Sequence, residues 1–115
     1  MEAQIIELTS ANFEATISEG ITLVDFWAPW CMPCKLMAPI FDSVAEQVGD
    51  KVRFAKVNID QELELANRLG IQSIPTLMLF KDGRDVDVRI GLTKAPELVA
   101  MIKEDVEKAI AHVEN

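Results

Sequence analysis

The spacing of hydrophobic positions changes along the chain, and each spacing predicts a different element. Two nearly continuous apolar runs, residues 21–28 and 52–59, are typical of strands that are covered on both faces. Between them, residues 35–48 repeat apolar side chains at the period of an amphipathic helix. The apolar stripe of that helix is expected to consist of Leu36, Ile40, Val44 and Val48, with Met37 and Phe41 beside them.

Shorter patterns fill the chain around these runs. Residues 5–8 suggest a first strand. Thr9 or Ser10 is expected to cap a helix that ends near Ser18, and Asp60 is expected to cap another helix with an acidic first turn. Strands that alternate with helices in this way predict a parallel sheet with helical crossovers.

The last third of the chain predicts an antiparallel hairpin and a final helix. Residues 76–80 and 85–90 are expected to be strands, and Asp82-Gly83 between them favours a tight turn. Thr93 is expected to cap the last helix. The apolar face of that helix is expected to carry Leu98, Ile102, Val106 and Ile110.

Length and composition limit the possible functions. The 115 residues, half of them hydrophobic, predict one domain over residues 1–115 with a sizeable core. The formal net charge of -8 argues against nucleic acid and against an anionic membrane surface, because both attract basic proteins. No apolar run reaches transmembrane length, and the first residues lack the pattern of a signal peptide. We therefore expect a cytoplasmic protein, and a monomer.

Cys31 and Cys34 are the only cysteines, and they lie two residues apart between a predicted strand and a predicted helix. This placement is typical of a dithiol–disulfide redox centre. Cys31 lies just before the first turn of the helix, where free backbone N–H groups favour a thiolate. We expect Cys31 to attack a substrate disulfide and Cys34, the more buried thiol, to resolve the mixed disulfide. Pro33 suits the first helical turn, because a proline there loses no hydrogen bond.

A structural metal site is the alternative for these cysteines. Tetrahedral zinc requires four ligands, and the chain adds only His112, which lies far away along the sequence. An intrachain zinc site is therefore not expected, while a metal shared between two chains stays open as a minor alternative.

Asp25 interrupts an apolar strand and is the second candidate for chemistry. Strand alternation places it on the same face as Leu23 and Trp27, so we expect a buried carboxyl whose pKa is raised by desolvation. Such a group is a suitable proton acceptor for Cys34. Lys56 lies within the next apolar strand; it either pairs with Asp25 or extends its amine to water.

Several motifs along the chain, taken together, form a wider pattern that includes the two cysteines. They are Val24-Asp25-Phe26-Trp27-Ala28-Pro29-Trp30-Cys31-x-Pro33-Cys34-Lys35, Ala38-Pro39, Lys56-x-Asn58-x-Asp60, Ile74-Pro75-Thr76, Phe80-Lys81-x-Gly83 and Gly91. In this set the chain resembles the thioredoxin family over nearly its whole length. The resemblance implies an α/β fold with a central mixed sheet of five strands flanked by four helices, and a reductase of protein disulfides.

The resemblance also implies roles for individual residues. Cys31 is the nucleophile, Cys34 the resolving thiol, Asp25 the buried acid–base group and Lys56 its neighbour. Pro75 is implied to be cis and to face the disulfide, although the pattern alone predicts a trans bond, because only about 5–6% of such bonds are cis. The implied substrate surface consists of Trp30, Met32, Pro33, Ile74, Pro75, Gly91 and Leu92.

The family needs no bound cofactor or metal beyond its redox disulfide. Its implied partners are a thioredoxin reductase, linked to NADPH or ferredoxin, and client proteins that contain disulfides. The chain departs from the commonest family pattern at Met32, where glycine is usual, and we interpret this as a change in partner choice. An oxidase or isomerase, and a binding or chaperone subunit without turnover, stay open as alternatives.

Overall fold

The computed structural model describes residues 4–114, with side chains up to residue 108. The elements are β1 (Ile5–Glu7), α1 (Phe13–Ile17), β2 (Ile21–Trp27), α2 (Met32–Val48), the 3₁₀ turn η1 (Gly49–Lys51), β3 (Arg53–Asn58), α3 (Leu63–Arg68), β4 (Thr76–Lys81), β5 (Arg84–Ile90) and α4 (Ala95–Glu114). This order confirms the predicted alternation of strands and helices followed by a hairpin. It also confirms the mixed five-stranded sheet with four helices.

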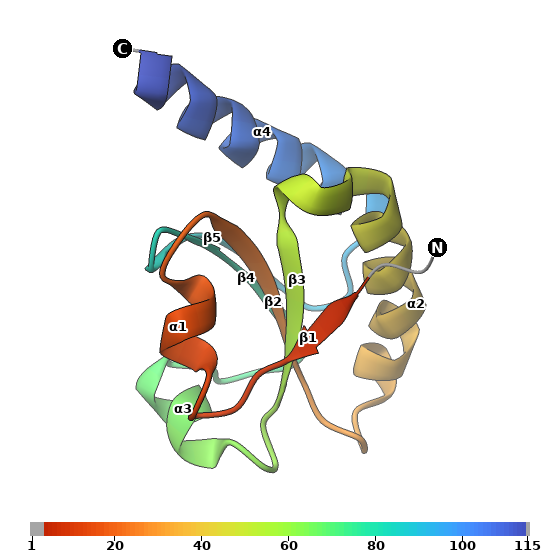
Figure 1. Cartoon of the computed structure of the whole chain (residues 1–115). Coiled ribbons are helices and arrows are strands. Elements are labelled where there is room, and N and C mark those ends of the chain that lie inside the picture. The colour runs from red at the N-terminus through yellow and green to blue at the C-terminus, as the bar shows by residue number, and fades with distance from the viewer. Residues whose placement is uncertain (1–3, 115) are drawn as a thin grey trace.

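The five strands form one sheet in the order β1-β3-β2-β4-β5. β1, β3 and β2 are parallel, whereas β4 and β5 run antiparallel to their neighbours. Helices α2 and α4 cover one face of the sheet, and α1 and α3 cover the other (Figure 1). β2 is the central strand and is buried along almost its whole length, which explains its continuous apolar run.

Each face of the sheet has its own hydrophobic core. Under α2 and α4, the core includes Leu23, Phe41, Leu77 and Ile102. Under α1 and α3, a separate cluster is built around side chains of β2, β3 and β4 that point the other way. Alternate residues of β2 therefore belong to different cores, as the pleat of a strand requires.

The predicted cap of the first helix, Thr9 or Ser10, is wrong. Helix α1 begins after Asn12, which makes no side-chain cap, and Thr9 instead donates its backbone N–H to Asn12 Oδ1 at 2.7 Å. Ser10 hydrogen-bonds through its backbone N–H and hydroxyl to Glu62 Oε1. The polar residues before α1 thus form a turn that is tied to a distant segment, and the helix is shorter than the sequence predicts.

The predicted caps of the two later helices are also wrong. Helix α3 begins at Leu63 after Glu62, so Asp60 is too early to cap it. The Thr93 hydroxyl donates to Gly91 O at 3.1 Å, a contact with the preceding loop. In both cases a tertiary or loop contact competes with the local cap for the same side chain.

The buried stripe of α2 differs in one position from the prediction. Met37, Phe41 and Val44 are buried, but Leu36 is exposed, because the helix turns its Cys34–Met37–Phe41 side to the sheet. In α4, Leu98 and Ile102 are buried and Val106 packs against the core, whereas the side chain of Ile110 lies outside the described part.

The predicted hairpin turn between β4 and β5 is confirmed. Asp82 and Gly83 both have positive φ, 49° and 89°, as a tight turn that follows the sheet's twist requires. Among the described residues, no helix combines the length and apolar character that crossing a membrane would demand.

Candidate functional site

The cysteine pair lies where the central strand passes into the first turn of α2. β2 ends at Trp27, and a short loop carries the chain to Cys31, which is the N-cap residue of α2. Cys31 and Cys34 form a disulfide with their Cα atoms 5.2 Å apart. The backbone N–H of Cys34 points at Cys31 Sγ, with N and S 3.2 Å apart. A negative charge on this sulfur would therefore meet a helix N-terminus and a directed donor.

The two sulfurs are not distinguished by exposure. Cys31 is 4% exposed and Cys34 is 3% exposed, and both pack in a small cluster with Ala28, Ile59 and Ile74. What separates them is position in the helix. Cys31 lies outside the first turn and accepts the N–H bond, whereas Cys34 lies within the turn and donates it.

A second loop covers the disulfide from the start of β4. The Ile74–Pro75 peptide bond is cis, as the family resemblance implies and contrary to the pattern-based expectation of trans. Cys31 Sγ lies 3.9 Å from the carbonyl oxygen of Ile74. Gly91, just beyond β5, donates its N–H to the Pro75 carbonyl at 2.8 Å. The segments around Cys31, Pro75 and Gly91 thus meet at one place, although they are distant in the sequence.

Several apolar side chains around this place are exposed to solvent. Trp30 is 67% exposed and Met32 is 62% exposed, and Leu92 is also exposed. Pro33 is exposed as well, Ile74 is half-buried and Pro75 is buried. A group of exposed apolar side chains on a protein with a net charge of -8 is typical of a binding site.

Asp60 belongs to this site, although the sequence pattern placed it at a helix cap. Its carboxylate accepts a hydrogen bond from Trp30 Nε1, at 3.1 Å to Oδ1 and 3.0 Å to Oδ2. This contact fixes the exposed indole ring beside the cysteines. The only signal in the sequence is that Asp60 ends the Lys56-x-Asn58-x-Asp60 motif, which does not reveal its partner.

Asp25 lies in the middle of β2, in register with Lys56 of β3. It is 1% exposed, and its Oδ1 has no hydrogen-bond partner among the described residues. Burial raises the pKa of Asp25 from 3.8 to about 6, with Lys56 acting to lower it and Asp42 to raise it. The carboxyl therefore exchanges its proton close to neutral pH.

Lys56 is half-buried between aromatic rings. Its Nζ lies 6.0 Å from the centre of the Trp27 ring and 5.7 Å from that of Phe41. No ion pair within 4 Å joins it to Asp25 in the described part of the chain. Its strand neighbour on the other side is Glu7 of β1. Lys56 is thus in register with Asp25 without an ion pair to it, and its charge still acts to lower the pKa of Asp25.

A surface hollow of about 340 Å³ lies beside the charged side chains of Lys56 and Glu7. It is lined by Ile5, Ile6, Glu7, Trp27, Asp42 and Lys56. It brings solvent close to Lys56, the in-register neighbour of Asp25. Among the described side chains, no three metal-ligating groups of the His, Cys, Asp or Glu type come together.

Comparisons with known proteins agree on one family. The family model described as Thioredoxin matches residues 4–104. Thioredoxin from Bacillus subtilis is 39% identical over 100 residues, which cover 87% of this chain and 96% of that protein. Thioredoxin 1 from Synechococcus elongatus is 49% identical over 86 residues, which cover 73% of this chain and 80% of that protein. The crystal structure of Malassezia sympodialis thioredoxin superposes with a TM-score of 0.81 at 31% identity, covering 90% of this chain and 92% of that one.

Proposed function

The chain belongs to the thioredoxin family and is a thiol–disulfide oxidoreductase that reduces protein disulfides, and from this premise we propose how its residues divide the work. The observation that carries the proposal is the N–H of Cys34 directed at Cys31 Sγ at the start of α2. A donor and a helix N-terminus at one sulfur favour its thiolate, which is the nucleophile in disulfide exchange.

In the first step the Cys31 thiolate attacks one sulfur of a client disulfide. A bond forms between Cys31 and that sulfur, the client's S–S bond breaks, and the second client sulfur leaves as a thiolate that takes a proton from water. The mixed disulfide joins Cys31 to the client. Because the Cys31 sulfur lies beside the Ile74 carbonyl, the client backbone docks against this loop and the neighbouring Gly91.

In the second step Cys34 attacks the Cys31 sulfur. Asp25 accepts the Cys34 proton, through water, because its raised pKa makes its carboxylate a competent base near neutral pH. The Cys31–Cys34 bond forms, the bond to the client breaks, and the released client sulfur leaves as a thiolate that takes a proton from water, so that the client now carries two thiols. Two electrons have moved from the protein to the client. Lys56 tunes Asp25 through its charge.

The surface that binds clients consists of Trp30, Met32, Pro33, Ile74, Pro75, Gly91 and Leu92. Met32 extends a polarisable apolar side chain from the residue beside the nucleophile, and it is exposed. We expect Met32→Gly to change the relative rates on several disulfide clients. Identical rates on every client, together with an unchanged redox potential, would remove this residue from the determinants of specificity.

The electrons come from a thioredoxin reductase that uses NADPH or ferredoxin, and the partners are disulfide-containing clients. The active form is a monomer that works in the cytoplasm, where a lone reactive cysteine pair is kept reduced. No resident cofactor or metal takes part, since the disulfide of Cys31 and Cys34 carries the two electrons.

The direct test is reduction of insulin disulfides by dithiothreitol. We expect the protein to accelerate precipitation of the insulin B chain. Cys31→Ser is expected to abolish the acceleration, and Cys34→Ser is expected to trap the mixed disulfide. A parent protein that does not accelerate the reaction, or a Cys31→Ser variant as active as the parent, would contradict the proposed roles.

A further inference from the structure

Strand β5 is the open edge of the sheet on the side away from β1. An edge strand presents unpaired N–H and C=O groups that can bind another strand. Gly91 donates its N–H to Pro75, which directly precedes β4, and successive residues of a strand point their backbone groups to opposite sides. The backbone N–H and C=O groups of Arg89 and Asp87 therefore face β4, and those of Val88 face outward.

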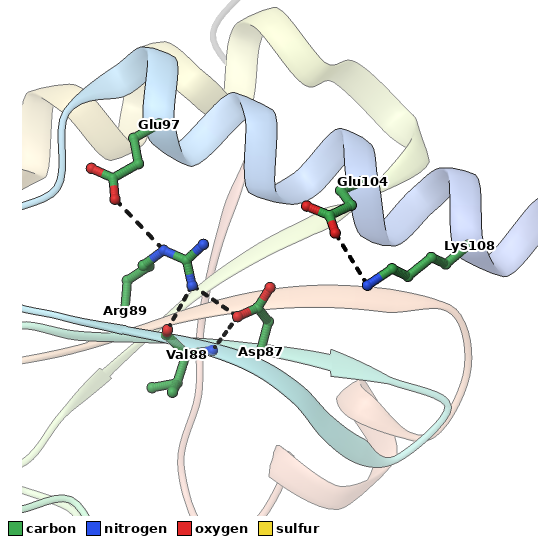
Figure 2. Close-up of polar contacts among 6 residues, drawn as sticks. All are labelled: Asp87, Val88, Arg89, Glu97, Glu104 and Lys108. Atoms are coloured by element: carbon green, nitrogen blue, oxygen red, sulfur yellow. Dashed lines mark hydrogen bonds and ion pairs between the residues drawn. The ribbon is translucent and has the colours of Figure 1, made fainter.

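The outward groups of Val88 are occupied by side chains of the residues on either side. Val88 N–H donates to Asp87 Oδ1 at 2.9 Å, and Arg89 Nη1 donates to the Val88 carbonyl at 2.9 Å. Arg89 Nη1 also binds Asp87 Oδ1 at 2.9 Å, which closes the ring of contacts. We call this arrangement the Val88 clamp (Figure 2).

Helix α4 lies over the side chains of the clamp. Arg89 Nε lies 3.8 Å from Glu97 Oε1, and Asp87 lies on the face of β5 that α4 covers (Figure 2). The Val88 side chain points to the opposite face, away from α4, and it is 43% exposed together with the exposed Val86 and Ile90. A strand with an apolar stripe of this kind is prone to association when its edge is free.

The rest of the edge is protected in another way. The pairing of β4 with β5 shifts between Leu79 and Phe80, which leaves Val86 as an extra residue in a bulge. Bulges twist an edge strand and hinder pairing. The regular part of the edge that follows is centred on Val88, which is where the clamp lies.

The sequence of this part is self-complementary. If two copies of β5 pair antiparallel about Val88, Asp87 of each copy lies opposite Arg89 of the other, and Val88 pairs with itself. The intramolecular contacts of the clamp would then be exchanged for equivalent contacts between chains. A second copy of this chain is therefore the partner that fits the edge best.

We propose that the Val88 clamp keeps β5 closed to strand addition, and that opening it lets β5 pair with β5 of a second copy. The monomeric state then depends on two side chains of one strand. The clamp acts on backbone groups, so its effect is separate from the chemistry of the cysteines.

The test compares two double variants with the same net charge as the parent. Asp87→Thr/Arg89→Thr removes the clamp and keeps β propensity, and it leaves the pairing to the freed N–H and C=O of Val88 and to cross-strand threonine pairs in the same register. Arg84→Thr/Asp85→Thr makes the same exchange at the start of the same strand and is the matched control. Sedimentation is measured at about 0.3 M salt, which screens the repulsion between two acidic chains.

We expect the clamp variant to shift with concentration from the monomer mass of 12.8 kDa toward twice that mass, while the parent and the control stay monomeric. Adding Val88→Pro to the clamp variant removes the outward N–H and is expected to restore the monomer. A clamp variant that stays monomeric, or a dimer that survives Val88→Pro, would overturn the proposal.

A measurement on the parent protein tests the clamp without any variant. The amide of Val88 is expected to exchange hydrogen more slowly than that of Ile90, which also faces outward, because only the Val88 N–H is bound by a side chain. Equal exchange rates at the two amides would show that the clamp does not form, and would equally overturn the proposal.

Discussion

At the scale of single residues, the site depends on where charge is stabilised. Cys31 and Cys34 are equally buried, so access alone does not assign their roles. The N-cap position of Cys31 and the N–H bond that it accepts make it the sulfur on which negative charge is favoured. Asp25 is the opposite case, because burial favours its neutral form and raises its pKa to about 6.

The pH dependence of the resolving step follows from Asp25. Below pH 6 the carboxyl is protonated and cannot accept the Cys34 proton, so we expect the decay of a preformed mixed disulfide to accelerate as pH rises through about 6. Asp25→Asn is expected to slow this decay about 10²-fold or more and to flatten its pH profile, while the first attack changes much less. Stopped-flow measurement of the two steps gives both rates.

The exposed carboxylate of Glu46 in α2 provides the control for that experiment. Glu46→Gln removes one negative charge from the same side of the sheet, and we expect the profile of the parent. If Asp25→Asn slows attack and resolution equally, or leaves the pH profile unchanged, Asp25 is not the base.

The disulfide of Cys31 and Cys34 and the burial of Asp25 were predictable from the sequence, because each breaks a local rule: a cysteine pair before a helix, and a carboxyl inside an apolar strand. The sequence pattern misplaced Asp60 because its partner, Trp30, is thirty positions away in the chain. It showed no sign of the clamp either, since Asp87 and Arg89 look like ordinary solvent-facing residues of an alternating strand. Contacts that depend on tertiary structure leave no periodic signal.

At the scale of elements, the junction of β5 with α4 has a second buried carboxyl. Asp105 of α4 is buried, and its Oδ2 has no partner among the described residues. Burial raises the pKa of Asp105 to about 6, and a hydrogen bond and the negative charge of Asp87 act in the same direction. Its neighbours Glu104 and Lys108 form an exposed ion pair of 3.2 Å on the same helix (Figure 2).

The raised pKa of Asp105 sets the sign of a stability change. The folded protein holds this proton up to about pH 6, whereas the unfolded chain loses it near 3.8, so the carboxyl's stabilising contribution is lost as pH rises through 6. Asp105→Asn is therefore expected to raise the free energy of unfolding by about 1–3 kcal/mol at pH 8, and by less at pH 4. Urea denaturation at both pH values measures this difference.

Glu104→Gln is the matched variant for that comparison, because its carboxylate is exposed on the same turn. We expect it to change the free energy of unfolding by less than about 0.5 kcal/mol at either pH. Destabilisation by Asp105→Asn at pH 8 would show that the folded protein satisfies the ionised carboxyl well, and the raised pKa of Asp105 would then be wrong.

The elements themselves were predictable to within a few residues, and their ends were not. Apolar runs and helical periods located most strands and α-helices, because burial on a sheet face imposes them, whereas α3 was predicted from its acidic first turn and η1 was not predicted. The caps at Thr9, Asp60 and Thr93 failed, since each side chain found a partner outside the helix it precedes. The predicted burial of Leu36 was wrong because positions spaced four apart drift around a helix that has 3.6 residues per turn.

At the scale of the whole molecule, an acidic protein presents one apolar surface beside its disulfide. The net charge of -8 opposes association between copies of the chain, and the exposed Trp30 and Met32 form the apolar part of the surface that we propose for clients. The motif retains proline before the second cysteine and has no histidine between the cysteines, unlike the more oxidising members of this fold. The whole molecule is therefore suited to donate electrons.

The redox potential tests whether the protein donates electrons to its clients. The redox potential of thioredoxin is about -270 mV and that of protein disulfide isomerase is about -180 mV, and from family membership we expect a value close to the former. Equilibration with glutathione buffers and alkylation of free thiols gives the number. A potential close to that of the isomerase would support the oxidase or isomerase alternative instead.

The most direct test of the central claim is the ionisation of Cys31 itself. In a Cys34→Ser variant, which keeps the backbone N–H at residue 34, the rate of alkylation by iodoacetamide is followed as a function of pH. We predict a midpoint between about 3.5 and 7.5, a range that includes known thioredoxins. A midpoint near the ordinary cysteine value of about 8.5 would contradict the claim, because the helix N-terminus would then not stabilise the attacking sulfur.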